Sequence, residues 1–137
     1  MGMKLFLDAC TIIYLIESQE ILGQKTRLFV EQFLQNNNHL VISRLSFLEC
    51  RILPLKTKDS NLLECYNKFF RLPNLQIVEL TPDVINLATD LRVAYSNALR
   101  TPDALQLACA LSANASTFLT GDKKLSVIQE IKIALIS

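Results

Sequence analysis

Short, continuous apolar segments alternate along this chain with segments whose apolar residues have helical spacing. The continuous segments, which we expect to be strands, are Lys4–Asp8, Leu40–Ile42, Leu75–Leu80, Thr117–Thr120 and Lys132–Ile136. Runs without polar alternation are typical of strands that are buried on both faces. Strands separated by helices indicate a parallel sheet with helices on both faces. The sequence therefore predicts an α/β fold with a mainly parallel sheet of about five strands.

The helices that we expect between the first three strands are Ile12–Ile16, Thr26–Gln35, Ser46–Leu55 (ending near Pro54) and Ser60–Leu72. Two further helices open alike, with Thr81-Pro82-Asp83 and Thr101-Pro102-Asp103. In each we expect the threonine to cap the helix, the proline to occupy the first turn and the acid to interact with the helix dipole. Small residues after Asp103 predict that its helix lies close against the sheet, whereas bulkier residues after Asp83 hold the other helix farther out.

The chain has 137 residues, the size of one ordinary domain, and no stretch has the composition of a linker. We therefore expect a single domain over residues 1–137. The three glycines form neither G-x-G-x-x-G nor a P-loop, which excludes the usual nucleotide-cofactor and NTPase sites.

Asp8 interrupts the first apolar run, and a carboxylate there excludes a membrane span or a signal-peptide core. We therefore expect no membrane association and a cytoplasmic location. The four cysteines form no C-x-x-C pair and lie among apolar residues, so we expect them to be reduced and buried. A single histidine, His39, excludes a His-pair ribonuclease and an H-E-x-x-H metalloprotease. Any chemistry must come from carboxylates, hydroxyls and lysines.

Acidic residues follow predicted strands or begin predicted helices at four places: Asp8, Glu49, Asp103 and Asp122. Ligands of parallel sheets bind at the carboxyl ends of the strands, where these acids should gather. Each acid also has an ordinary structural interpretation. Asp8 fits a helix cap, Glu49 an S-x-x-E capping box, Asp103 a partner of the helix dipole and Asp122 a turn.

Four carboxylates at one edge would repel one another and raise one another's pKa values. A divalent cation removes this conflict, and Mg²⁺ and Mn²⁺ prefer oxygen ligands of this kind. We therefore expect Mg²⁺ or Mn²⁺ to bind to Asp8, Glu49, Asp103 and Asp122.

Four segments resemble, in order, the motifs of the PIN domain. Leu5–Thr11 resembles its opening strand and acid, Ser46–Glu49 its second acidic element, Thr101–Ala110 the third and Phe118–Leu125 the fourth. These segments span nearly the whole chain, and its length is that of VapC-like toxins. The chain departs from the family at Cys10, where PIN domains often have a small polar residue.

This resemblance implies a three-layer α/β/α sandwich and a metal-dependent endoribonuclease, the toxin of a toxin–antitoxin pair. It implies that Asp8, Glu49, Asp103 and Asp122 hold the metal, with Thr11 and Thr120 next to them. A water activated by the cation would hydrolyse the RNA phosphodiester bond. Glu49 either binds a second cation or orients the water. The resemblance further implies a homodimer and a cognate antitoxin.

The net charge of +1 is not typical of a nucleic-acid-binding protein. Without the four acids, however, 14 basic side chains face only nine acidic ones. Arg100, Lys123 and Lys124 lie beside the acids in the sequence, so we expect them to bind RNA phosphates; a solvated basic surface is the alternative.

Two other functions stay open on the sequence alone. A PIN-like domain can bind RNA or a protein partner without cutting. The segment Asp8-Ala9-Cys10-Thr11 also resembles the D-x-D-x-T motif of haloacid-dehalogenase-type phosphatases. That segment lacks the second acid, which protonates the leaving group in those enzymes, so this interpretation is the weaker of the two.

Overall fold

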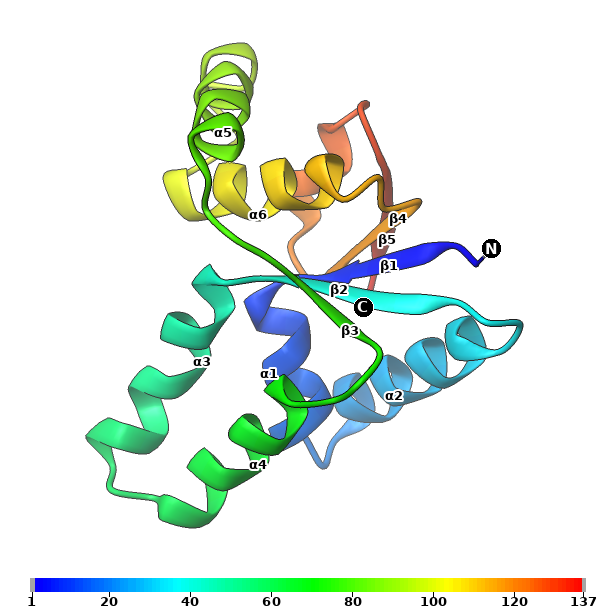
Figure 1. Ribbon diagram of the computed structural model, residues 1–137, viewed down its shortest axis with the longest axis vertical. Helices are drawn as coiled ribbons and strands as arrows, with labels where there is room; N and C mark the ends of the chain where they lie inside the picture. Colours follow the sequence, from blue (N-terminus) through cyan, green and yellow to red (C-terminus); the bar gives the residue numbers. More distant parts are fainter. Residues whose placement is uncertain (1, 137) are drawn as a thin grey trace.

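A computed structural model describes residues 2–136 and has one five-stranded sheet, in which all neighbouring strands run parallel (Figure 1). The strands are β1 (Lys4–Leu7), β2 (His39–Ser43), β3 (Leu75–Val78), β4 (Thr117–Thr120) and β5 (Lys132–Leu135). Their order across the sheet is β3-β2-β1-β4-β5. The chain therefore adds strands on one side of β1 and then, from β4 onward, on the other side. The predicted parallel sheet is confirmed.

Helices cover both faces of the sheet. They are α1 (Ala9–Glu17), α2 (Ile21–Leu34), α3 (Leu45–Lys56), α4 (Ser60–Phe70), α5 (Pro82–Ala94), α6 (Thr101–Ser112) and the short 3₁₀ helix η1 (Lys123–Val127). Helices α1 to α4 lie on one side of the sheet, and α5, α6 and η1 on the other (Figure 1). The predicted three-layer α/β/α sandwich is therefore confirmed. Within residues 2–136, no helix has both the length and the apolar character needed to cross a membrane.

The sheet separates two apolar clusters, which explains why its strands lack polar alternation. Phe6 of β1 faces the α6 side and stacks on Phe118 of β4, with the ring centroids 5.1 Å apart. Its neighbours Leu5 and Leu7 face the α1 side and are fully buried there. Successive side chains of one strand point to opposite faces, so a strand covered by helices on both sides needs apolar residues throughout.

Helix α6 lies against the sheet, where it contacts β2, while α5 packs on α6 from outside (Figure 1). The buried residues Ala104, Ala108 and Ala110 have short side chains, which allow this close approach. The predicted difference between the two helices is therefore confirmed. It places the first turn of α6, and not that of α5, at the edge of the sheet.

The ends of α3 and α1 and the burial of the cysteines test the finer expectations. Helix α3 ends at Lys56, two residues after Pro54, as expected, because a proline so close to the end removes one hydrogen bond without stopping the last turn. Helix α1 begins earlier than expected, directly after Asp8, whose side chain caps it. Of the cysteines, Cys50 and Cys109 are buried as expected, but Cys10 and Cys65 are exposed.

Candidate active site

Asp8 stands at the point where β1 ends and α1 begins. Its Oδ1 accepts a hydrogen bond from the backbone N–H of Thr11 over 2.9 Å, which makes Asp8 the cap of α1. Its Oδ2 accepts from the hydroxyl of Thr120 over 2.7 Å. Burial nevertheless raises the pKa of Asp8, against the lowering effect of these donors. The capping interpretation is therefore correct, and it leaves a buried, destabilised carboxylate at the edge of the sheet.

The two threonines named by the sequence have different contacts. The Thr120 hydroxyl, at the end of β4, donates to Asp8 and accepts from the backbone N–H of Asp122 over 3.1 Å. Thr120 thus connects two of the predicted site acids. The Thr11 hydroxyl instead donates to the carbonyl of Leu119 over 2.9 Å and fastens α1 to β4.

Glu49 is held by a residue from the opposite layer. Gln106, on α6, donates from Nε2 to Glu49 Oε1 over 2.9 Å and to the hydroxyl of Ser46 over 3.1 Å. The capping-box interpretation of Ser46 and Glu49 was wrong: Arg44 is the cap of α3, so Ser46 lies inside the helix and its hydroxyl faces Gln106. Sequence reasoning did not single out Gln106, although a buried glutamine in an apolar helix is a signal that it could have used.

Asp103 and Asp83 occupy different helical positions despite their identical Thr-Pro-Asp segments. In α5 the hydroxyl of Thr81 caps the helix and accepts from the N–H of Val84 over 3.2 Å, as predicted. In α6 the cap is Arg100, one residue earlier, so the expected cap at Thr101 was wrong. Asp103 is therefore the third helical residue, and its Oδ2 accepts from the backbone N–H of Arg100 over 3.4 Å. It is half-buried, whereas Asp83 is exposed.

Three of the four acids line one small pocket of about 110 Å³, together with Gln106. Asp8 comes from the end of β1, Glu49 from α3 and Asp103 from the start of α6. The pocket lies at the carboxyl edge of the sheet, next to the point where the strand order reverses between β1 and β4. This is the place where open parallel sheets bind their ligands.

Asp122 does not belong to the lining of this small pocket. It follows β4, and its Oδ1 accepts from the backbone N–H of Lys124 over 3.0 Å. With Asp103 it lines a larger hollow of about 530 Å³, whose lining also includes Arg100 and Lys124. Lys123 is exposed and does not belong to that lining. Asp103 is thus shared between an acidic pocket and a hollow that contains basic residues.

The acids influence one another electrostatically. Burial raises the pKa of Glu49, and the negative charges of Asp8 and Asp103 raise it further. Burial also raises the pKa of Asp103, to which the charge of Asp122 contributes, while the N–H of Arg100 and nearby positive charges lower it. The carboxylates of Glu49 and Asp103 are therefore less stable in their charged forms than they would be in water, which is the condition that a bound cation relieves.

The donor set of this pocket fits a hard divalent cation. Within residues 2–136, no three His, Cys, Asp or Glu side chains are grouped closely enough to hold a metal ion as the side chains stand. The pocket nevertheless offers the carboxylate oxygens of Asp8, Glu49 and Asp103, and the buried Oε1 of Gln106 has no hydrogen-bond partner among the described residues. Oxygen ligands with excess negative charge suit Mg²⁺ or Mn²⁺.

Cys10 lines the same pocket. Partial burial of its sulfur raises the pKa of the thiol, and the negative charges of Asp8 and Asp122 raise it further. The thiol is therefore neutral at physiological pH and adds no charge to the acids.

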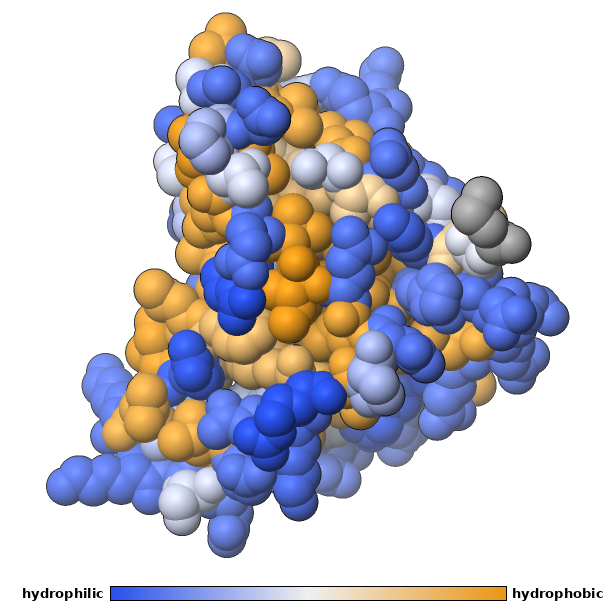
Figure 2. All heavy atoms as spheres, viewed as in Figure 1, coloured by the Kyte–Doolittle hydropathy of each residue, from blue (hydrophilic) through white to orange (hydrophobic). Residues whose placement is uncertain are grey.

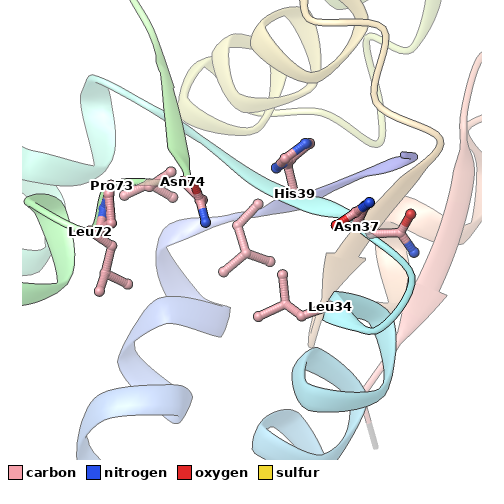
Figure 3. Close-up of a pocket in the computed structure, with 9 residues that line it drawn as sticks. Leu34, Asn37, His39, Leu72, Pro73 and Asn74 are labelled. Atoms are coloured by element: carbon pink, nitrogen blue, oxygen red, sulfur yellow. The ribbon is translucent and has the colours of Figure 1, made fainter. Parts of the chain in front are cut away.

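A separate hollow of about 390 Å³ lies at the opposite end of the strands (Figure 3). It is bordered by the end of α2 and by the segment between α4 and β3; Figure 3 shows Leu34 and Leu72 on opposite sides of it. The lining includes His39 but, among the described residues, no carboxylate. Its apolar character and its distance from the acids make it a poor place for chemistry that depends on carboxylates.

A comparison with protein families matches residues 5–131 to the family described as PIN domain. No curated protein matches the sequence significantly. Solved structures with the same fold include VapBC2 from Rickettsia felis bound to a DNA fragment from its promoter. Over 98% of this chain and 100% of that one, the TM-score is 0.77 and the sequence identity 19%.

Two further structures have similar chains. A toxin–antitoxin complex from Klebsiella pneumoniae has a TM-score of 0.71 and 19% identity over 97% of this chain and 98% of that one. VapC20 from Mycobacterium tuberculosis, described as a sarcin–ricin-loop-cleaving toxin, has a TM-score of 0.69 and 13% identity over 93% of this chain and 98% of that one. At these identities the likeness shows the shared fold.

Proposed function

The chain belongs to the PIN-domain family, and from this membership we propose that it is a metal-dependent endoribonuclease, which hydrolyses phosphodiester bonds of RNA. The observation that carries the proposal is the shared pocket of Asp8, Glu49 and Asp103. These acids come from three separate elements, and all have raised pKa values. A fold gains no stability from gathering destabilised carboxylates, so their arrangement supports a catalytic role.

Asp8, Glu49, Asp103 and Asp122 are the residues that would hold the cation. A bound Mg²⁺ or Mn²⁺ supplies a lowered pKa for the attacking water and stabilisation of the charge on the leaving oxygen. The protein's own part is to position the ligands. Thr120 fixes Asp8 and the backbone of Asp122, and Gln106 fixes Glu49. Basic residues beside the acids, among them Arg100 and Lys124, attract the RNA.

We further propose that the chain is the toxin of a toxin–antitoxin pair and forms a homodimer. The solved structures that share the fold of this chain include chains of toxin–antitoxin complexes. A stripe of exposed apolar side chains on α3 supports a protein partner: Leu48, Ile52 and Leu55 are 57%, 56% and 60% exposed and recur at helical spacing. Figure 2 shows hydrophobic residues gathered over α3. An antitoxin encoded by a neighbouring gene should co-purify with the chain and inhibit cleavage.

The test of the enzymatic proposal is incubation of the purified, partner-free chain with total RNA, in Mg²⁺ or in EDTA. Cleavage that needs the metal supports the nuclease. Binding of RNA without cleavage in Mg²⁺ would instead indicate a PIN-like binding module. Hydrolysis of a small phosphomonoester in place of RNA would indicate a phosphatase.

A further inference from the structure

The hollow next to the acidic pocket has the character of a phosphate-binding site. It measures about 530 Å³ and is lined by the basic residues Arg92, Arg100 and Lys124, as well as by Asp103 and Asp122. It shares Pro102 and Asp103 with the acidic pocket, so the two lie next to each other. A substrate bound at the acids therefore has the basic residues beside it on one side.

The wall of this hollow is built from the connection between α5 and α6. The guanidinium of Arg92 donates to the carbonyl of Leu99, and the N–H of Leu99 donates to the carbonyl of Tyr95 over 3.0 Å. These bonds close the connection into a turn that leads directly to Arg100, the cap of α6. Arg92 and Arg100 are thus attached to a hydrogen-bonded frame, whereas Lys124 comes from η1.

The three basic residues are not engaged in ion pairs. Over residues 2–136 the ion pairs are Arg44 with Glu79 and Arg71 with Glu64, both away from the hollow. Asp103 and Asp122 do lie in the same lining, but they are the residues that a cation would neutralise. With the acids neutralised, the hollow presents three positive charges to a ligand.

We propose that this hollow holds the phosphodiester adjacent to the one being cut in a single-stranded RNA, with Lys124 and Arg100 as its contacts. The proposal rests on the proposed nuclease function and adds to it the position of the neighbouring nucleotide. The size of the hollow suits one nucleotide of a single strand, which is the form in which proteins most often hold RNA with its bases unstacked.

Two adjacent lysines provide a matched test. Lys124 lines the hollow, whereas its neighbour Lys123 is exposed outside the lining. Binding of a fluorescein-labelled single-stranded RNA of mixed sequence is measured by anisotropy at several salt concentrations. All variants carry Asp8→Asn in Mg²⁺, so that the RNA stays intact. Lys124→Gln should lower the slope of log affinity against log salt by about 0.7, the value for one phosphate contact to a single strand. Lys123→Gln should leave the slope nearly unchanged.

An uncharged variant of the same lining, Asn97→Ala, controls for disturbance of the hollow and should not alter the slope. Equal slopes for the two lysine variants, or no binding of RNA at low salt, would overturn the inference. Cleavage by the chain with Asp8 intact is measured separately. If the chain cleaves RNA but the two lysine variants have equal salt slopes, only the inference about the hollow is refuted. If RNA binds through Lys124 and the chain does not cleave it, only the proposed nuclease function is refuted.

A second measurement identifies the phosphate. Oligonucleotides are made with one uncharged methylphosphonate linkage at successive positions around a mapped cleavage point. The intact chain should lose cleavage efficiency when a linkage on one flank is uncharged, and Lys124→Gln should be insensitive to that same substitution. If the lysine variant and the uncharged linkage lower cleavage efficiency additively, Lys124 does not contact that phosphate directly.

Discussion

Thr120 Oγ1 lies 2.7 Å from Asp8 Oδ2 and donates a hydrogen bond to it, which joins the end of β4 to the end of β1. These two strands are neighbours in the sheet although more than a hundred residues separate them in the chain. The contact therefore forms only when β1 and β4 are paired. It holds one carboxylate of the candidate site in a single orientation.

Thr120→Val should weaken both the site and the fold. The change leaves Asp8 Oδ2 and the N–H of Asp122 without this partner in a buried place, so we expect a loss of about 1–3 kcal/mol in the free energy of unfolding. Removal of a group that orients metal ligands typically lowers metal affinity about 10–100-fold. Mg²⁺ titration of RNA cleavage measures this effect. Thr120→Ser keeps the hydroxyl and should retain the affinity for Mg²⁺. A lowered Mg²⁺ affinity in Thr120→Ser would show that loss of the hydroxyl does not explain the effect of Thr120→Val.

The paired Thr-Pro-Asp segments allow a comparison within one molecule. Asp103→Asn should abolish metal-dependent cleavage, because this acid lines the pocket. Asp83→Asn should leave cleavage unchanged and cost only about 0.3–1 kcal/mol of stability, the usual size of an interaction with a helix dipole. Cleavage rates and thermal unfolding of both variants provide the measurement. Equal activities in the two variants would mean that Asp103 acts only at its helix end.

The sequence predicted the sheet but not the contacts that shape the site, and the reason is physical. A run such as Leu5-Phe6-Leu7 indicates a strand with both faces buried, whatever its neighbours are. The link between Gln106 and Glu49 depends on how α6 and α3 meet across 57 residues, which no local pattern records. The one-residue shift of the cap from Thr101 to Arg100 is equally non-local, because tertiary packing of α6 against the sheet decides where its first turn begins.

In the absence of metal, the buried carboxyl of Asp8 should make the free energy of unfolding fall as the pH rises. Burial raises its pKa above the ordinary value of 3.8, so the folded protein holds this proton more tightly than the unfolded chain does. Stability is therefore lost as the pH rises from the ordinary pKa through the raised one. Asp8→Asn removes this loss, because the neutral amide does not titrate. Denaturant unfolding in EDTA at several pH values should show the variant gaining on the intact chain as the pH rises; a constant difference would contradict the raised pKa.

Gln106→Leu tests the residue that sequence reasoning missed. The substitution removes the hydrogen bond that lowers the pKa of Glu49, so this pKa should rise further. We expect the pH at which cleavage sets in to move upward, since Glu49 then needs a higher pH to lose its proton. The pH profile of cleavage, compared with that of the intact chain, is the measurement. A lower rate with an unchanged profile would assign Gln106 to packing.

A comparison of two proteins in two solutions decides whether the acidic pocket cuts RNA by means of a divalent cation. Cleavage of total RNA is measured for the intact chain and for Asp8→Asn, with circular dichroism as the check that both are folded, in Mg²⁺ and in EDTA. We expect cleavage by the intact chain in Mg²⁺, none in EDTA and none by folded Asp8→Asn in either. Equal cleavage by the two proteins in Mg²⁺, or cleavage that persists in EDTA, would contradict this mechanism.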